Sequence, residues 1–505
     1  MESNGPTMAR PVGLLESYST SRHNMGFYCC VAHTARFSVP QSLLRDQDLG
    51  SVIEHAVAQT ILSHPVLQVG IVGEDTTAPN YVYLPSLDLS KLIRWEQVDT
   101  LTSAERDAAL QRVLEVRHSA LWPDLHELPG YQFIIMCPNP AIFPVTGTLT
   151  IDIIFAFHHG YGDGTSGVLL QRTLLRALNN PVPVPSLNLS THTLTINTPA
   201  PLPPPQDALI NFSISWSFLL RSLWDEFAPS FLKPAPPEPA WAGKPITPHP
   251  KGTRLRLLSF PPPTASAIVA RCRAKSTTLT PLLHVLLLHS LAKRLPVPAI
   301  ANHTLTCATP ISLRRLIPPG GKQGFDPDNS MGVMLATHDH RFSASTIRQI
   351  RAAGGGDDPE FLVWDLTASL GEDLKRKVAS LPSDDITALM AWISDYNAWW
   401  RKKLGKEREE TWQVSNVGAA DFRGTGDEKT GWSVDRVVFS QSGNVGRSAF
   451  SVSVAGVRGG ELAVTLTWQE SIVDDELLDG VAADLREWLT TFARTGRLGF
   501  AAGGR

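Results

Sequence analysis

The sequence has 505 residues, more than one hydrophobic core ordinarily organises, so length alone favours two or more domains. Hydrophobic residues make up 43% and charged residues only 18%, a balance typical of a compact enzyme and unlike that of a disordered chain. The formal net charge of −3 excludes a basic field that holds phosphate backbones, and no nucleic-acid partner is expected.

Cysteine usage and the N-terminal sequence bear on location. The five cysteines include no CxxC pair, so neither a zinc site nor a disulfide framework is indicated, and a reducing compartment fits best. The opening MESNGPTMARPVGLLESYS lacks the layout of a signal peptide, and no apolar run reaches the roughly 18 residues of a membrane span. We predict a cytoplasmic monomer without stable membrane insertion, and peripheral membrane contact stays open.

Two proline-rich stretches, over residues 181–205 and 229–263, divide the chain. Proline disfavours both helix interiors and central strands, so these stretches indicate a crossover between domains. We predict an N-terminal lobe over residues 1–195, a crossover with one apolar helix over residues 196–250, and a C-terminal lobe over residues 251–505.

In the first half, a strand, a glycine-rich loop and a helix are predicted in direct succession. Residues 149–157 (LTIDIIFAF) predict a buried strand, because they are short and rich in branched and aromatic side chains. Residues 165–178 carry apolar side chains at helical spacing and predict a helix. The loop between them reads HHGYGDG.

The crossover contains the apolar segment DALINFSISWSFLLRSLWDEF, residues 207–227. Its apolar residues cover most of a helical circumference, which favours a helix buried between the lobes or against one of them. The alternative is a helix that lies on a membrane surface. The segment lacks the lysine-rich polar face of such helices, so the buried helix is preferred.

The second half opens with another predicted helix. Thr280 suits a helix cap and Pro281 the first turn, and LLHVLLLHSLAKRL continues as a largely buried helix. On it, His284 and His289 are expected at or near the core rather than as ligands.

The rest of the second half again mixes strands and helices. Residues 401–410 (RKKLGKEREE) predict a solvated helix face or loop, residues 447–468 two strands joined by a glycine turn, and residues 474–493 an amphipathic helix. Strands and helices in both halves predict an α/β sandwich.

The loop from His158 to Gly164 carries the chemistry. Acyl transfer to a hydroxyl needs a base, and histidine suits that role because its pKa lies near neutrality. Since side chains alternate along a strand, His158 and His159 are expected to face opposite sides. Asp163 can fix the loop, Gly164 leaves the backbone open to a ligand, and the following helix start offers N–H groups to an oxyanion.

Other interpretations of this loop are weaker. A metal site from His159 and Asp163 lacks further ligands, and no metal is expected. Residues 162–167 match GxGxxG, but the acid that a dinucleotide fingerprint needs about 20 residues later is missing. A purely structural glycine turn is the third possibility. No Walker A sequence and no GxSxG elbow occurs.

The loop resembles the HHxxxDG signature of chloramphenicol acetyltransferase, condensation domains of peptide synthetases and plant BAHD acyltransferases. Within that superfamily the sequence is most similar to fungal alcohol acetyltransferases. Further similar segments follow in the same order along the chain: RPVGLLESYSTSRHNMGFY, ILSHPVLQVGIV, TPISLRRL, VSNVG, FSQSG and GGELAVTLTW. The plant DFGWG motif is only partly echoed by DFRG at residues 421–424.

The resemblance implies a chloramphenicol-acetyltransferase-like α/β fold with two lobes and an inter-lobe tunnel. It also implies an acyl-CoA-dependent O-acyltransferase, which takes acetyl-CoA as co-substrate, holds no permanent cofactor and acts on a small-molecule alcohol. The site residues that follow are His159 as the general base, with Asp163 and Gly164; Tyr161, Ser415, Asn416 and Gln441 in substrate binding; and His158 and Arg314 in structural roles. Arg314 is the candidate partner of Asp163, with a solvated Arg314 as the alternative, and a cap or turn role suits Asn416 nearly as well.

Two other functions stay open. The same fold serves as a non-acyl catalyst, such as a cyclase, or as a binding protein, and a lost base would mark that case. An NAD(P)-dependent oxidoreductase is the third possibility, and the missing acid speaks against it.

Overall fold

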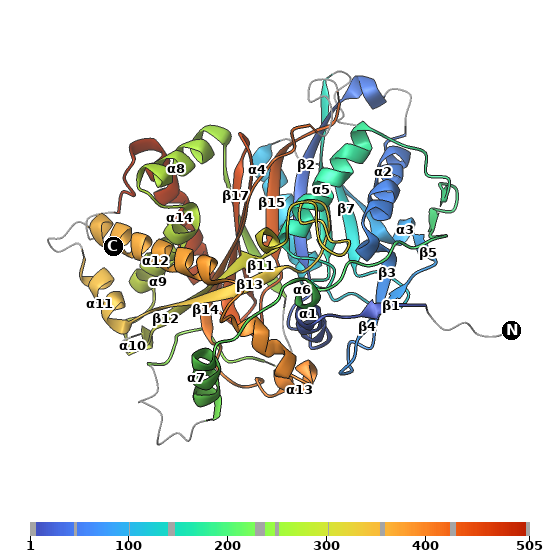
Figure 1. Ribbon diagram of the computed structural model, residues 1–505. Coiled ribbons are helices and arrows are strands. Elements are labelled where there is room, and N and C mark those ends of the chain that lie inside the picture. The colour runs from blue at the N-terminus through green and yellow to red at the C-terminus, as the bar shows by residue number, and fades with distance from the viewer. Residues whose placement is uncertain are drawn as a thin grey trace.

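Two large β-sheets form the framework of the molecule, one in the right half of Figure 1 and one in the left. The computed structural model describes residues 7–44, 48–99, 102–139, 147–227, 238–247, 252–300, 302–353, 359–424 and 431–500. Helices pack on both sheets, so the predicted mixture of strands and helices in each half is confirmed.

The five-stranded sheet carries the motif loop at the end of a central strand. Its order is β15 (Ser433–Gln441), β2 (Val31–Pro40), β8 (Thr148–Phe157), β7 (Tyr131–Pro138) and β6 (Ile93–Val98). β8 pairs with an antiparallel neighbour on each side and is buried along most of its length, as its apolar run predicts. α5 (Gly164–Asn179) follows the loop and packs on α2 (Leu49–Ser63) and β2. The strand and the helix predicted around HHGYGDG are both confirmed.

The six-stranded sheet lies in the left half of Figure 1. Its order is β11 (Thr253–Phe260), β17 (Leu462–Gln469), β16 (Ser448–Val457), β14 (Glu410–Ala420), β12 (Leu305–Ser312) and β13 (Leu335–Phe342). Helices α8 (Pro262–Ala274), α9 (Leu279–Arg294), α11 (Ala344–Ala352), α12 (Pro359–Ser380) and α14 (Asp475–Thr495) pack beside it around a second core. The predicted strand pair and closing helix match β16, β17 and α14.

Shorter elements complete the chain. The remaining helices and 3₁₀ turns are α1 (Leu14–Asn24), Gln41–Leu44, Pro65–Gln68, α3 (Leu89–Leu92), α4 (Ser103–His118), α6 (Gln206–Leu209), α7 (Trp216–Phe227), α10 (Val297–Ile300), Arg314–Leu316, Ile386–Trp392 and α13 (Tyr396–Arg401). Two three-stranded sheets combine β1 (Met8–Pro11), β4 (Asn80–Tyr83) and β3 (Val69–Val72), and β5 (Ser86–Asp88), β10 (Thr193–Thr195) and β9 (Leu187–Asn188).

One strand crosses between the two halves of the chain. β15 comes late in the sequence but pairs with β2 in the first sheet, and it also packs against β16 and β17 of the second. Arg436 on β15 is 2% exposed and binds Asp107 of α4 and Ser259 of β11. The division into residues 1–195, 196–250 and 251–505 stays a prediction, and β15 does not follow it.

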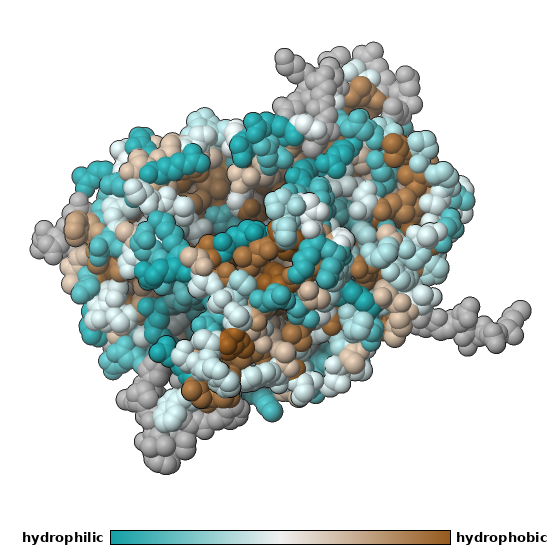
Figure 2. Space-filling model, in the orientation of Figure 1, coloured by the Kyte–Doolittle hydropathy of each residue, from teal (hydrophilic) through white to brown (hydrophobic). Residues whose placement is uncertain are grey.

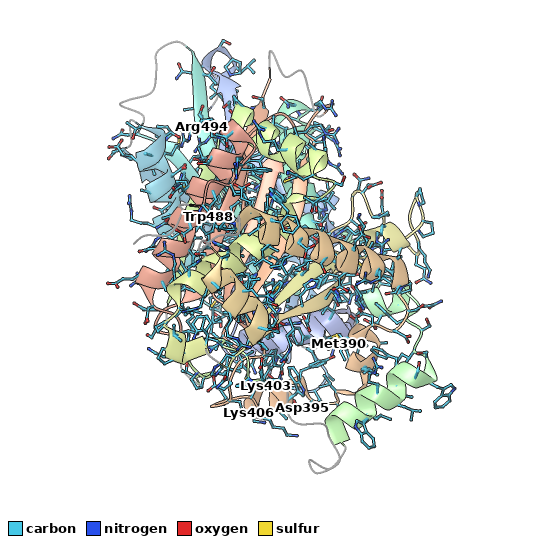
Figure 3. The ribbon with its side chains drawn as sticks, turned by 90° about the vertical axis from the view of Figure 1, so that its left-hand side faces the viewer. Met390, Asp395, Lys403, Lys406, Trp488 and Arg494 are labelled. Atoms are coloured by element: carbon cyan, nitrogen blue, oxygen red, sulfur yellow. The ribbon has the colours of Figure 1, made fainter. Side chains whose placement is uncertain are left out.

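The helix predicted to be buried over residues 207–227 is wrong in two respects. The segment forms two helices, α6 and α7, and Asp384 accepts hydrogen bonds from the backbone and hydroxyl of Ser215 just before α7 begins. On α7, Trp216, Leu220 and Trp224 lie four residues apart on one face and are 79%, 62% and 48% exposed. Figure 2 shows apolar surface at this position, and in Figure 3 α7 (green) stands at the edge of the molecule.

Two smaller expectations in the second half also need correction. α9 begins after Thr278 rather than at Thr280, although its interior is buried as predicted and includes His284 and His289. The charge run over residues 401–410 is not wholly solvated, because Arg408 and Glu410 are buried.

The five cysteines are all free, and none of the helices in the described ranges is long and apolar enough to cross a membrane.

Candidate active site

Asp163 fixes the turn between β8 and α5. It is the N-cap of α5, and its Oδ1 accepts hydrogen bonds from the backbone N–H of Ser166 at 2.8 Å and the Ser166 hydroxyl at 3.0 Å. Its Oδ2 accepts from the backbone N–H of Met334 at 3.1 Å, and the side chain is buried. Both oxygens of this carboxylate therefore accept hydrogen bonds from the protein.

Arg314 approaches Asp163 from the second half of the chain. Its Nη2 lies 3.4 Å from Asp163 Oδ1, with both side chains buried, and it donates to the Ser166 hydroxyl at 3.0 Å. Its Nη1 donates to the backbone carbonyls of Pro327 and Ser330. The structure thus brings together the pair expected from the resemblance, at a contact between the two halves.

His159 lies next to a cavity and is half-buried. Its Nδ1 is buried and has no hydrogen-bond partner within the described residues. Burial, with a contribution from the nearby guanidinium of Arg22, lowers the pKa of His159 to about 4. The imidazole is therefore neutral at pH 7, the form that accepts a proton.

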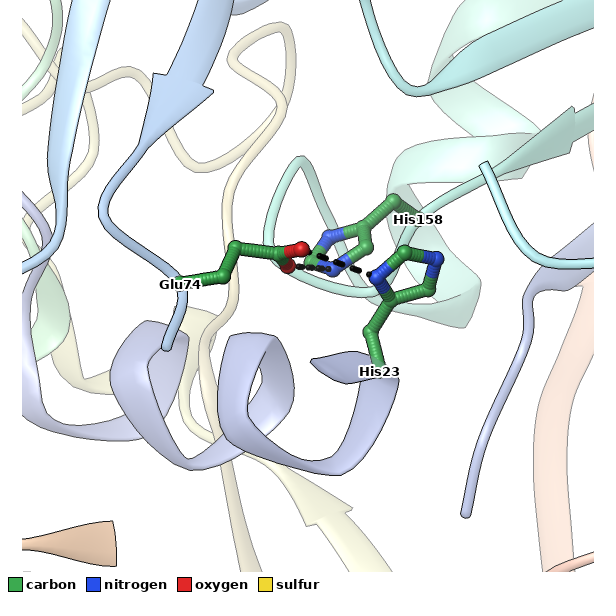
Figure 4. Close-up of side chains that lie close together, drawn as sticks. All are labelled: His23, Glu74 and His158. Atoms are coloured by element: carbon green, nitrogen blue, oxygen red, sulfur yellow. Dashed lines mark hydrogen bonds and ion pairs between the residues drawn. The ribbon is translucent and has the colours of Figure 1, made fainter. Parts of the chain in front are cut away.

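His158 turns away from His159 and joins a buried cluster with Glu74 and His23. Its Nε2 lies 3.2 Å from Glu74 Oε1, while Nδ1 of His23 lies 3.1 Å from Glu74 Oε2. Figure 4 shows both imidazole rings converging on this carboxylate. Burial opposes the charge on Glu74, but the hydrogen bonds from His158 and His23 outweigh it and lower the pKa of Glu74 to about 2.

The tautomers of both histidines in this cluster follow from their other partners. Nδ1 of His158 accepts from the backbone N–H of Gly160, and Nε2 of His23 accepts from the backbone N–H of Trp122. The nitrogens that face Glu74 must then carry the protons. A neutral His158, donating to an ionised Glu74, thereby holds the backbone on which His159 stands.

Among the described residues, side-chain atoms that could bind a metal gather at this cluster and at one other. His338 Nε2 and His340 Nδ1 lie 2.8 Å and 3.1 Å from Asp373 Oδ2, on β13 and α12. The position of the proton on the His340 ring also follows from its hydrogen-bond partners. Trp412 can only donate to His284, so His284 donates to Thr309, and the Thr309 hydroxyl is left to donate to His340 Nε2. Nδ1 of His340 thus carries a proton toward Asp373, and here too the carboxylate accepts from imidazole N–H.

Both halves of the chain line the cavity beside His159. Gly164, Ser415 and Gln441 are on its wall, as expected from the resemblance. A side chain at Gly164 would not fit, because its Cβ would lie 2.7 Å from Val417 Cγ1 and 2.9 Å from Phe439 Cζ. The remaining lining residues are Leu15, Tyr18, Ser19, Arg22, Tyr28, Val31, Pro310, Leu335, Thr337, Gln413, Phe439, Asn444 and Arg447.

Two residues expected in substrate binding lie elsewhere. Tyr161 is fully buried in the first core, where its hydroxyl donates to the backbone carbonyl of Val69, so its assignment to the substrate is wrong. Asn416 holds a turn, because its Oδ1 accepts from the backbone N–H of Gly418 and its Nδ2 donates to Thr280. Gly418 has φ +80°, which glycine adopts readily.

Four residues of the site lie outside the motif and were missed from the sequence. Tyr28 packs its ring 5.6 Å from that of His159, and its hydroxyl donates to Gln441. The guanidinium carbon of Arg22 lies 4.5 Å from the centre of the Tyr28 ring, and His23 and Glu74 hold His158. Three of them, Arg22, His23 and Tyr28, lie in the segment RPVGLLESYSTSRHNMGFY that resembles the family, but this likeness assigned no role to single residues.

Comparison with known proteins gives matches over nearly the whole chain. A family model described as alcohol acetyltransferase matches residues 145–483. The probable alcohol acetyltransferase FCK4 of Fusarium pseudograminearum is 31% identical over 98% of each chain. The probable alcohol acetyltransferase crmB of Aspergillus fumigatus is 27% identical over 93% of this chain and 96% of its own. These matches confirm the resemblance to fungal alcohol acetyltransferases.

Solved structures share the fold at low sequence identity. The trichothecene 15-O-acetyltransferase TRI3 of Fusarium sporotrichioides superposes with a TM-score of 0.67 at 13% identity, over 96% of this chain and 94% of its own. The first condensation domain of the CDA synthetase gives 0.55 at 13% identity, over 97% and 96%. The predicted chloramphenicol-acetyltransferase-like α/β fold is confirmed, and the inter-lobe tunnel stays a prediction.

Proposed function

Because the chain belongs to the alcohol acetyltransferase family and is an acyltransferase, we propose that it moves the acetyl group of acetyl-CoA to the hydroxyl of a small-molecule alcohol, with His159 as general base. The observation that carries the proposal is the state of His159. It borders the cavity between the two halves, its Nδ1 is unpartnered among the described residues, and its lowered pKa keeps it neutral. A neutral imidazole at the wall of the cavity is the form that abstracts a proton.

The reaction needs no covalent enzyme intermediate. His159 takes the proton as the acceptor oxygen attacks the carbonyl carbon of the thioester, and the C–S bond then breaks. The proton passes from the imidazolium to the departing thiolate, so His159 is neutral again and free CoA and the ester leave. Asp163 already occupies the backbone N–H of Ser166, so we assign the developing oxyanion to the N–H groups beside Gly164 at the start of α5.

Acetyl-CoA and the acceptor enter the reaction together in this scheme. The cavity supports this scheme, because it is lined by residues from both halves of the chain, before position 165 and after position 309. We propose that a tunnel between the lobes admits the acyl-CoA from one face and the alcohol from the other, with acetyl-CoA as co-substrate and no resident cofactor.

The test is turnover of acetyl-CoA with a panel of alcohols by the wild type and by His159→Ala. Loss of the base should lower kcat by about 10²–10⁴-fold while acetyl-CoA binding and the melting temperature persist. His126→Ala is the matched control, because its exposed imidazole lies away from the cavity. Wild-type turnover in His159→Ala would show that another group takes the proton.

A further inference from the structure

The side chain of Arg22 is a buried cation without an anion. It projects from α1 into the cavity that His159 borders, and the residue is 6% exposed. Its Nε is buried without a hydrogen-bond partner, and over the described ranges no hydrogen bond or ion pair of its guanidinium occurs. A buried charge left unpaired is costly, so an arginine in this state is expected to meet its partner in a ligand.

Aromatic rings offset part of that cost. The guanidinium carbon lies 4.6 Å from the centre of the Tyr18 ring and 4.5 Å from that of Tyr28. Such cation–π contacts stabilise the guanidinium, but they use none of its five N–H donors. The rings hold the guanidinium in place while its hydrogen-bonding capacity stays available.

The rest of the cavity wall does not supply an anion. Among its described residues none is an aspartate or glutamate. The other cation there, Arg447, is already neutralised, because it pairs with Glu410 and Asp339. Arg22 is thus the cation of the wall whose charge is not balanced by the protein.

We propose that Arg22 is a carboxylate-binding subsite, which selects substrates that carry a carboxylate a short distance from the reacting group. A guanidinium fork binds a carboxylate through two parallel hydrogen bonds. Tyr28 contacts both Arg22 and His159, so the two groups act on one small molecule across the width of one aromatic ring. This inference rests on the proposed function, since it names the substrate class of the same site.

The carboxylate has two possible sources, the acceptor alcohol or the acyl group of the donor. The acceptor is probed with 4-(hydroxymethyl)benzoate and its methyl ester, in which a neutral ester replaces the charged carboxylate at the cost of one added methyl group, with acetyl-CoA as donor. The donor is probed with malonyl-CoA and acetyl-CoA on the methyl ester. In one of the two arms, the wild type should prefer the charged substrate by 10- to 100-fold in kcat/KM, and Arg22→Gln should lose that preference.

Arg401→Gln is the matched control, because that side chain is exposed on α13 and should keep the wild-type preference. The melting temperature of ligand-free Arg22→Gln should not fall, since the variant removes an unpaired buried charge. Arg22→Lys should retain part of the preference, as it keeps the charge without the fork. The proposal would be overturned if Arg22→Gln lowered kcat/KM equally for charged and neutral substrates, or if it weakened only the binding of free CoA. A wild-type protein that shows no preference for the charged substrate in either arm would also overturn it.

A binding measurement separates this proposal from the reaction itself. One outcome is that the wild-type protein acetylates neither acceptor, but 4-(hydroxymethyl)benzoate raises its melting temperature more than the ester does. If Arg22→Gln then abolishes this difference, the proposed function fails and the subsite stands. If His159→Ala abolishes turnover but the charge preference survives in Arg22→Gln, the function stands and the subsite fails.

Discussion

Burial around His159 sets the pH at which the proposed base works. Its pKa of about 4 lies below the ordinary value near 6.5, so the ring stays neutral down to mildly acidic pH. The acid limb of kcat/KM should therefore fall near pH 4 rather than near 6.5. Measuring kcat/KM from pH 3.5 to 8, in steps of about half a unit, locates the limb.

Acid unfolding must be separated from this titration. A histidine whose pKa is lowered on folding stabilises the protein above its unfolded pKa, and that contribution is lost as pH falls from about 6.5 to 4. Buried His33, His64 and His118 share this direction. Thermal melts at each pH give the folded fraction, and an acid limb near 6.5 in fully folded protein would contradict the assignment of His159.

Asp163 is predicted to matter through stability. Asp163→Ala removes the N-cap of α5, the acceptor of Met334 N–H and the carboxylate beside Arg314, which together should cost about 3 kcal/mol. This is the low end of the free-energy cost of breaking a buried ion pair, because Arg314 keeps its hydrogen bonds to backbone carbonyls. Free energies of unfolding from urea titration provide the measurement.

Asp48 is the matched control for this variant. It caps α2 at the surface by accepting from the backbone N–H of Ser51 at 2.8 Å, so Asp48→Ala should lose only the cap, about 1 kcal/mol. Equal losses for the two variants would mean that the buried contacts of Asp163 add nothing to its role as a cap.

At the scale of elements, α7 presents an apolar face to solvent. Replacing Trp216, Leu220 and Trp224 together by serine should change the free energy of unfolding by less than about 0.5 kcal/mol per site, as for other exposed positions. Leu370→Ala on α12 is the contrast, because that side chain is 5% exposed and its truncation should cost about 2–5 kcal/mol. A comparable loss in the α7 variant would show that this face is covered in solution.

Local pattern predicts elements well and their surroundings poorly. β8, α5 and the β16–β17 pair follow directly from periodicity, since strand and helix spacing are properties of the segment itself. The same periodicity cannot tell whether an apolar helix face meets protein or water, and this is why α7 was placed in the interior. Long-range partners are equally invisible, because Glu74 lies 84 residues from His158 and 51 from His23.

The residues of the motif show the same contrast between what the local sequence predicts and what depends on distant parts of the chain. Alternation of side chains along the strand predicted that His158 and His159 face different surroundings, and the family resemblance suggested Arg314 as the partner of Asp163. The misplaced residue, Tyr161, has glycines on both sides, and nothing in that local sequence shows that its ring enters the core with Tyr81 and Tyr131.

At the scale of the whole molecule, β15 and Arg436 join the two sheets. Arg436→Ala should lower the free energy of unfolding by about 2 kcal/mol, because it removes a two-pronged contact to Asp107 and leaves that carboxylate without its buried partner. Arg458→Ala is the control, since its side chain is 64% exposed and its ion pair with Asp421 should contribute little. Equal melting temperatures for the two variants would show that the contact at Arg436 adds nothing measurable.

The carboxylate of Glu74 has a consequence for the size of the substrate. It binds His158, which precedes the proposed base His159, and it binds His23, which follows Arg22. With the proposed roles, this bridge helps to set the distance between the proton acceptor and the cation, because it ties together the two chain segments that carry them. Relatives that accept longer or shorter molecules in this cavity would need a different bridge, even with the same two working residues.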